Sequence, residues 1–130
     1  MASIFTKIIQ GEIPSYKIYE DDYCLCFLDI SPLAKGHVLV VPKNEVDYIF
    51  DLPDEIYNAL WAAAKHVSKA IESAIPCKRI GIAVIGLEVP HAHIHLLPLQ
   101  SVEDINFSRP KLSLSEDELT TIAAKITAAL

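Results

Sequence analysis

The sequence has no apolar run long enough to cross a bilayer, and charge and proline interrupt residues 1–14 before the apolar centre of a signal peptide could form. Basic residues are also scarce, since 11 lysines and arginines stand against 17 aspartates and glutamates, for a formal net charge of −6. Broad nucleic-acid binding needs a basic face, which this balance does not favour. We therefore expect a cytoplasmic protein that binds neither membranes nor nucleic acids.

The chain contains only three cysteines, with no internal repeat and no low-complexity linker. An odd number of cysteines in a small chain without an export signal favours reduced thiols. Cys24 and Cys26 should lie on one face of a strand as small buried hydrophobes. A length of 130 residues predicts a single domain, residues 1–130, with its own core.

The order of apolar patterns and turn signals predicts an α+β fold, an antiparallel, meander-like sheet of about five strands with helices packed on it. The expected strands are residues 16–20, 23–29, 37–41 and 79–85 and the histidine-rich segment that follows Pro90. The expected helices are residues 3–10, a long helix that starts at 51–55 and ends at Ala74, and a last helix opened by the capping box at Ser115.

Three of the five histidines occupy alternate positions in "VPHAHIHLLP", at His91, His93 and His95. Side chains of a strand alternate between its faces, so the three imidazoles should point the same way. Neighbouring imidazoles would then be about 6.5–7 Å apart. The intervening residues, which are all apolar, could bury under a helix.

Two kinds of chemistry fit such a row. Two of the imidazoles could bind a zinc ion together with His37 or Glu88, but a row of this length cannot bring all three to one ion. Alternatively, a neutral imidazole can attack phosphorus while flanking imidazoles orient it or hold phosphate oxygens. The middle position, His93, is then the natural nucleophile. The pattern favours catalysis over metal binding.

The segment "HAHIHLL" resembles the His-φ-His-φ-His-φ-φ motif, with φ apolar, of the histidine triad (HIT) superfamily. The segments "SIFTKIIQGEIPSYKIYEDD" and "CFLDISPLAKGHVLVVPK" are similar to the Hint-like branch and come in the same order. The likeness covers about residues 3–98 and leaves a C-terminal loop and helix, residues 99–130. It implies an α+β homodimer that binds purine nucleotides and cleaves at the α-phosphate through a nucleotidyl-histidine intermediate. Residues 53–74 and 79–85 would form the dimer interface.

The resemblance implies a role for each matching residue. His93 would be the nucleophile, His95 would contact the α-phosphate, and His91 would fix the imidazoles by hydrogen bonding. Asp29 would bind the ribose hydroxyls, although an Asp before Ser-Pro also commonly caps a turn. His37 would lie near the triad, where without the motif it would be a solvent-facing histidine at a strand start. An apolar slot for the base would be formed by Phe5, Ile8, Ile13, Phe27, Leu28 and Ile30.

The chain departs from its relatives at two places. The loop before the triad is shorter and lacks their Asn and Gln, with Leu87 and Glu88 in this stretch. If it is buried, Glu88 could donate a proton to the leaving group as a general acid, or it could cap the loop or lie in water. Some bacterial relatives hold structural zinc with Cys-x-x-Cys and a His, where this chain has Ser3, Thr6 and Glu45. We therefore expect no metal and no other cofactor.

The predicted function is hydrolysis or transfer at the α-phosphate of nucleotidyl esters or phosphoramidates, as in a nucleoside phosphoramidase, with a purine mononucleotide or its conjugate as ligand. One alternative is a nucleotide-binding regulatory module with vestigial catalysis, because the Asn and Gln are missing. A less favoured alternative is a histidine-ligated metal-binding protein.

Overall fold

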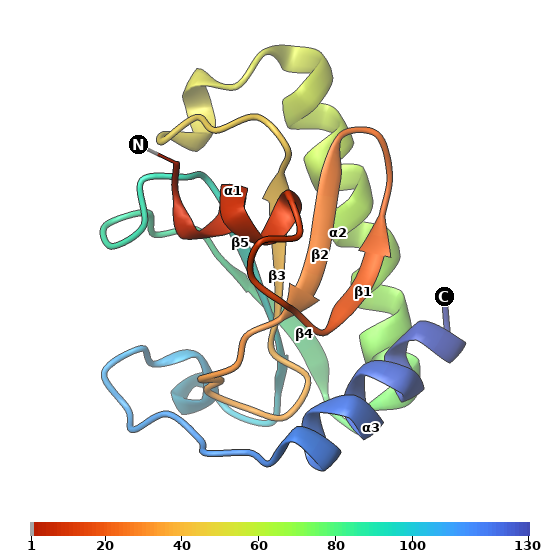
Figure 1. Cartoon of the computed structure of the whole chain (residues 1–130). Coiled ribbons are helices and arrows are strands. Elements are labelled where there is room, and N and C mark those ends of the chain that lie inside the picture. Colours follow the sequence, from red (N-terminus) through yellow and green to blue (C-terminus); the bar gives the residue numbers. More distant parts are fainter. Residues whose placement is uncertain (1) are drawn as a thin grey trace.

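The computed structural model describes residues 2–130, and it confirms the predicted α+β architecture (Figure 1). Five antiparallel strands form one sheet in the order β1-β2-β3-β5-β4. The strands and helices are β1 (Lys17–Glu20), β2 (Cys24–Leu28), β3 (Val38–Pro42), β4 (Arg79–Ala83), β5 (Ile94–Leu99), α1 (Ile4–Ile9), α2 (Asp54–Ala74) and α3 (Glu116–Ala128), with 3₁₀ turns η1 (Ile49–Asp51) and η2 (Val102–Ile105). No helix within residues 2–130 combines the length and apolar character needed to cross a membrane.

The expected meander is wrong for the second half of the sheet. β5 pairs with β3, in the register Leu39 opposite His95, and β4 takes the outer position beyond β5. The long helix α2 lies between β3 and β4 in the sequence. Unlike the two strands of a tight hairpin, β3 and β4 therefore do not have to be neighbours in the sheet. This order places β5 at the centre of the sheet and next to β3.

The central strands β2, β3 and β5 are buried on both faces. One face packs under α2 and α3, where Val40, Ile94 and Leu96 meet Leu60 and Val67 in the main core. The opposite face carries a smaller cluster under α1, formed by Phe5, Leu25, Phe27, Leu39 and Val41. Figure 1 shows α1 and α2 on opposite sides of the sheet. Burial on both faces explains why these strands are almost continuously apolar instead of alternating.

Two of the three helices, α1 and α3, begin where the sequence predicts. Ser3 caps α1 by accepting a hydrogen bond from the Thr6 amide, and Ser115 opens α3 with the predicted capping box. The predicted cap at Asp51 is wrong, because that residue belongs to η1 and α2 starts after Pro53 with no side-chain cap.

The triad segment is only partly a strand. β5 begins at Ile94, and the chain bends before it, with the Ala92 amide donating to the Val46 carbonyl at 2.7 Å. The predicted alternation nevertheless holds, because Ala92, Ile94 and Leu96 pack in the main core while the rings of His91 and His93 lie against Phe5 on the α1 side. The rings of His93 and His95 lie closer than strand spacing predicts, with centroids 4.9 Å apart.

Candidate active site

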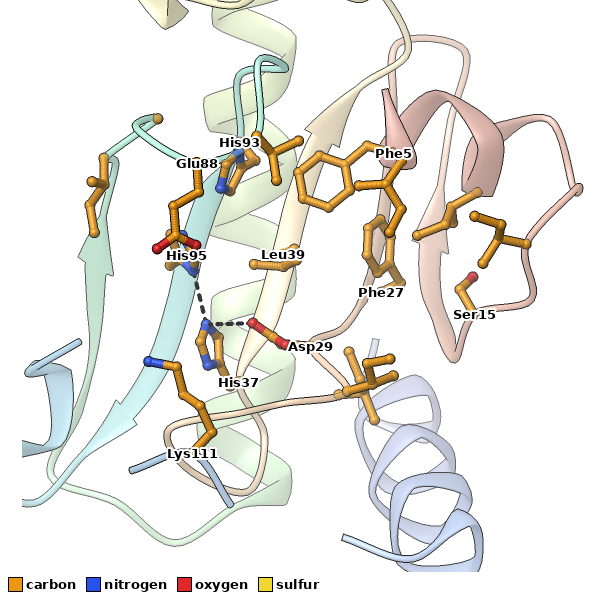
Figure 2. Close-up of a pocket in the computed structure, with 18 of the residues that line it drawn as sticks. Phe5, Ser15, Phe27, Asp29, His37, Leu39, Glu88, His93, His95 and Lys111 are labelled. Carbon is orange, nitrogen blue, oxygen red and sulfur yellow. Dashed lines mark hydrogen bonds and ion pairs between the residues drawn. The ribbon is translucent and has the colours of Figure 1, made fainter. Parts of the chain in front are cut away.

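A cavity of about 470 Å³ opens on the α1 side of the sheet (Figure 2). One end is apolar and contains all six residues predicted to hold a base, namely Phe5, Ile8, Ile13, Phe27, Leu28 and Ile30. The other end is polar and contains Asp29, His37, Glu88, His93, His95 and Lys111. The sheet brings these residues together because β2, β3 and β5 lie side by side.

His93 presents a neutral imidazole to the cavity. Its Nδ1 lies 2.7 Å from the backbone carbonyl oxygen of His91. A carbonyl only accepts hydrogen bonds, so Nδ1 carries the proton and Nε2 keeps its lone pair. Burial lowers the pKa of His93, and the Phe5 ring packs edge-on against the imidazole with centroids 4.9 Å apart. An unprotonated Nε2 in a cavity has the character of a nucleophile.

A second chain of hydrogen bonds sets the proton positions on His37 and His95. The Leu33 amide donates to His37 Nδ1 at 3.1 Å, so His37 Nε2 carries the proton. That nitrogen donates to His95 Nδ1 at 3.0 Å, which leaves the proton of His95 on Nε2. Burial lowers the pKa of His37 to about 3 and that of His95 to about 4. His95 therefore offers the cavity a neutral N–H donor.

Asp29 stands at the end of β2 and has two partners. Its Oδ1 accepts a hydrogen bond from the Ser31 amide at 2.9 Å, so the predicted turn-capping role is confirmed. Its Oδ2 lies 3.8 Å from His37 Nε2, and the side chain is 23% exposed. Burial raises the pKa of Asp29. The predicted contact with ribose hydroxyls stays a prediction, and the carboxylate lines the cavity where that contact would form.

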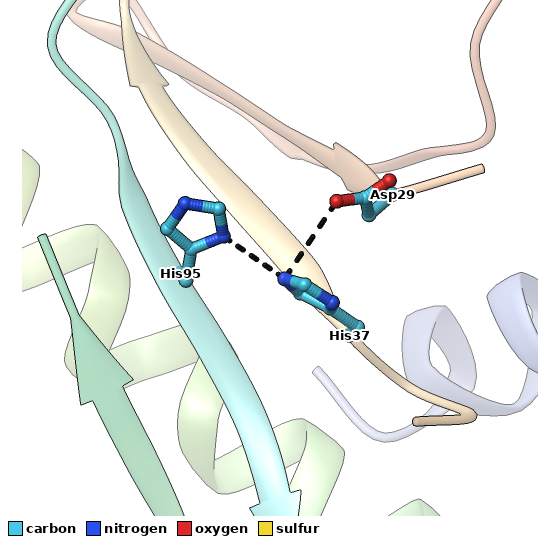
Figure 3. Close-up of side chains that lie close together, drawn as sticks. All are labelled: Asp29, His37 and His95. Carbon is cyan, nitrogen blue, oxygen red and sulfur yellow. Dashed lines mark hydrogen bonds and ion pairs between the residues drawn. The ribbon is translucent and has the colours of Figure 1, made fainter. Parts of the chain in front are cut away.

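Asp29, His37 and His95 form the one group among residues 2–130 with the composition and spacing of a metal site, with ligand atoms within 4.8 Å of one another (Figure 3). The hydrogen bonds do not suit a metal. The proton on His37 Nε2 lies on the line to His95 Nδ1, whereas a zinc ion would need lone pairs on both nitrogens. The three side chains therefore suit a chain of hydrogen bonds, and their arrangement does not suit a metal ion.

The ring of His91 lies on the α1 face of the sheet with those of His93 and His95, as predicted, and packs against Phe5 with centroids 5.8 Å apart, but it does not line the cavity. The ring is fully buried, and its Nε2 donates to the Pro42 carbonyl at 2.8 Å. Its Nδ1 then accepts from the Ser3 hydroxyl at 2.7 Å. Ser3 and Phe5 cover the side chain, and the His91 backbone carbonyl holds His93 in place.

The hydroxyl of Ser3 belongs to a network that ties α1 to the triad. Glu45 Oε1 accepts from the Ser3 amide and from the Thr6 hydroxyl, each at 2.6 Å. These hydrogen bonds lower the pKa of Glu45. Two hydroxyls, one carboxylate and one imidazole are a poor set of zinc ligands. Hydrogen bonds thus connect Ser3, Thr6 and Glu45, the three positions whose residue types argued against structural zinc in the sequence.

Of the alternatives for Glu88, exposure to water is the one that the structure supports. The side chain is exposed, and the neighbouring Leu87 is 88% exposed, because residues 84–90 project from the sheet. Glu88 lines the cavity but makes no hydrogen bond within residues 2–130, so the capping alternative gains no support either. A general-acid role loses its physical basis, since it depended on burial.

The cavity residues that the sequence analysis missed include two from the C-terminal part of the chain. Phe107 and Lys111 lie between η2 and α3, in a stretch without periodicity or motif. The Phe107 ring packs against His95 with centroids 4.8 Å apart and lies 6.2 Å from His37. No local signal in the sequence connects this segment to the triad, because only the folded chain brings them together.

The fold and site together define an α+β domain with hydrogen-bonded, buried histidines beside a cavity of about 470 Å³, and comparison with known proteins shows its family. The HIT domain family matches residues 10–102, so the chain belongs to the HIT family. It is 35% identical to an uncharacterized HIT-like protein of Borreliella burgdorferi, with 95% of each chain covered. It is 33% identical to the adenosine 5'-monophosphoramidase hnt1 of Schizosaccharomyces pombe, covering 98% of this chain and 97% of that protein. A crystal structure of a Hit-like protein from Bartonella henselae superposes with a TM-score of 0.86 at 32% identity, covering 98% and 96% of the two chains.

The Ser3 network predicts a stability effect beyond that of an ordinary helix cap. Ser3→Ala should lower the free energy of unfolding by about 1–3 kcal/mol, because it removes a cap and leaves the buried Nδ1 of His91 unpaired. Ser115→Ala is the matched control, since it removes a cap without a histidine partner and should cost about 1 kcal/mol. Urea denaturation measures both. Equal losses in the two variants would show that the Ser3–His91 bond contributes nothing.

The buried histidines predict that stability depends on pH. Because the pKa values of His37 and His95 in the folded protein are about 3 and about 4, below the ordinary 6.5, the unfolded chain binds more protons between these values. Their contribution is fully present above pH 6.5 and is lost as pH falls toward 4. Urea midpoints measured from pH 8 to pH 4.5 should fall on acidification, with a shallower slope in His37→Asn. His66→Asn, at an exposed helix position, should keep the wild-type slope, and an unchanged slope in His37→Asn would contradict the assignment.

Proposed function

We propose that this protein is a nucleotide hydrolase or transferase that cleaves at the α-phosphate of purine nucleotide derivatives, phosphoramidates or nucleotidyl esters, through a nucleotidyl-histidine intermediate on His93. The single observation that carries the proposal is the hydrogen bond from His93 Nδ1 to the His91 carbonyl, which leaves Nε2 as a free lone pair in the cavity. The similarity to a protein named as an adenosine 5'-monophosphoramidase supports this substrate class.

The cavity suggests how the substrate binds. Its apolar end, between Phe5 and Phe27, suits a flat base, and Asp29 can accept from ribose hydroxyls where β2 ends. The α-phosphate then falls at the histidine end of the cavity. In Figure 2, Phe5 and Phe27 lie on one side of Leu39, and His93 and His95 lie on the other.

The reaction then has two displacement steps at phosphorus. His93 Nε2 attacks the α-phosphorus, an N–P bond forms, and the bond to the leaving group breaks, with the leaving group taking a proton from solvent. Water then attacks the phosphorus and gives up a proton to solvent, the N–P bond breaks with its electron pair returning to His93 Nε2, and the nucleoside monophosphate is released. As the imidazole gains positive charge, its Nδ1–H bond to the His91 carbonyl strengthens. The N–H of His95 can donate to a phosphoryl oxygen in both steps.

His93→Ala tests the proposed nucleophile. Turnover of adenosine 5'-phosphoramidate should fall by at least about 10³-fold, because loss of a nucleophile removes the covalent route. AMP affinity should stay within a few-fold of the wild type, as measured by calorimetry. His66→Ala is the control and should keep wild-type turnover, since the residue lies on the far helix α2.

Unchanged turnover in His93→Ala would overturn the proposal. A wild-type protein that binds AMP and turns over no phosphoramidate would instead be a regulatory nucleotide-binding module. Activity that disappears in chelator and returns with metal would favour the metal-binding alternative.

We further propose that two copies of this chain associate through β4 and the neighbouring apolar surface. β4 is an outer strand of the sheet, and Ile82, Val84 and Ile85 on or next to it are 47%, 38% and 46% exposed. Phe50, which is 66% exposed, lies with Val84 and Ile85 along a second hollow that also reaches His93. Outer strands with exposed apolar side chains commonly pair with another copy. Dimerisation would therefore cover the side of the site next to His93.

The proposed dimer predicts a mass of about twice the 14.4 kDa of one chain in light scattering at micromolar concentration. Ile82→Glu with Ile85→Glu should give the single-chain mass, because the charges would oppose each other across the interface. Val102→Glu is the control, since Val102 is also exposed, at 84%, but lies in η2. A single-chain mass for the wild type would contradict the dimer.

A further inference from the structure

The charges around the cavity do not by themselves suit an anionic phosphate. Asp29 and Glu88 are carboxyl groups, and the imidazoles of His37 and His95 are neutral because burial lowers their pKa values to about 3 and about 4. Among the described residues that line the cavity, Lys111 is the only lysine or arginine. A phosphate that enters this end therefore has one full positive charge available to it.

The position of Lys111 is fixed by contacts on both sides. Its Nζ donates to the Phe107 carbonyl at 3.0 Å and lies 5.4 Å from the centre of the Phe107 ring. The amide of the next residue, Leu112, donates to the Pro32 carbonyl at 2.8 Å, which ties this segment to the turn before His37. In Figure 2 the amino group of Lys111 lies beside His37 and below His95, at the opposite end of the cavity from Phe27.

The amino group has unused capacity for a ligand. An ammonium group offers three donors, and one is taken by the Phe107 carbonyl. Lys111 forms no ion pair with any carboxylate of residues 2–130. The carboxyls of Asp29 and Glu88 line the same cavity but do not neutralise it directly. A lysine held at a cavity without a carboxylate partner is suited to bind an anionic oxygen.

We propose that Lys111 binds a nonbridging oxygen of the α-phosphate and makes the site select nucleoside monophosphoryl compounds over nucleosides. The inference rests on the proposed function and adds a binding residue to it. Lys111 lies outside the part of the chain that matches the HIT domain, residues 10–102. It would take the place of polar contacts that the short loop at residues 84–90 does not provide.

The contact also has a consequence for the reaction. Negative charge stays on the nonbridging oxygens throughout both displacements, so a cation beside them stabilises the transition state as well as the bound nucleotide. Because Lys111 is exposed on its outer side, part of this interaction is screened by salt. AMP affinity should therefore fall as ionic strength rises, while adenosine affinity should not change.

Calorimetric titration of AMP and of adenosine into four proteins tests the inference: wild type, Lys111→Gln, Lys111→Arg and Lys125→Gln. Lys111→Gln should weaken AMP binding by about 10- to 100-fold, as expected for loss of a hydrogen bond between charged groups. Its adenosine affinity should stay within twofold of the wild type. Lys111→Arg should restore most of the AMP affinity, and Lys125→Gln, at an exposed position of α3, should match the wild type for both ligands.

Equal AMP affinity in the wild type and Lys111→Gln would overturn the inference. Equal losses for AMP and adenosine would also overturn it, because they would show that Lys111 only holds the Phe107 segment in place. Lysine-dependent AMP binding without turnover of phosphoramidate would contradict the proposed function and leave the phosphate contact standing. A wild-type protein that binds neither ligand would overturn both.

Discussion

The hydrogen bond between His93 Nδ1 and the backbone carbonyl of His91 is the interaction on which the site depends. It sets the proton on one ring nitrogen and the lone pair on the other, and it fixes the plane of the ring. The carbonyl can do this only because His91 itself cannot move, since both of its ring nitrogens are bonded, one to Pro42 and one to Ser3. A fully buried histidine that touches no substrate thus determines the chemistry of its neighbour.

Burying four imidazoles in a small domain is costly unless their nitrogens find partners. Of the eight ring nitrogens of His37, His91, His93 and His95, six are hydrogen-bonded within the protein. The two that remain are Nε2 of His93 and Nε2 of His95, and both residues line the cavity. The first is an acceptor and the second is a donor. The hydrogen bonds that make burial tolerable therefore also leave one free lone pair and one free N–H at the cavity, the two groups that the proposed reaction uses.

Local signals in the sequence were enough to predict most of the helices and strands. The apolar strands, the short helix at residues 3–10 and the capping box at Ser115 were predicted from residues a few positions apart, and the structure contains these elements. Strand alternation predicted the shared face of the triad side chains, but not that Ser3 and Phe5 would cover His91, because that contact joins segments far apart in the sequence. The alternatives for Glu88 stayed open, because the sequence does not determine how the loop at residues 84–90 lies, and the structure leaves the side chain exposed. Lys111 was missed because its place beside the triad depends on a contact between distant segments.

The Ser3–Thr6–Glu45 network has a further role in the cavity, through α1. This helix carries Phe5, whose ring packs against His93 and against Phe27, so α1 forms both a wall of the apolar end of the cavity and part of the surroundings of His93. Hydrogen bonds hold α1 to the triad less firmly than a structural zinc ion would. The chain compensates by burying Phe5 with Leu39 and Val41 on the sheet. Packing on the sheet thus supplies the main attachment of α1, and the network aligns its first turn with His91.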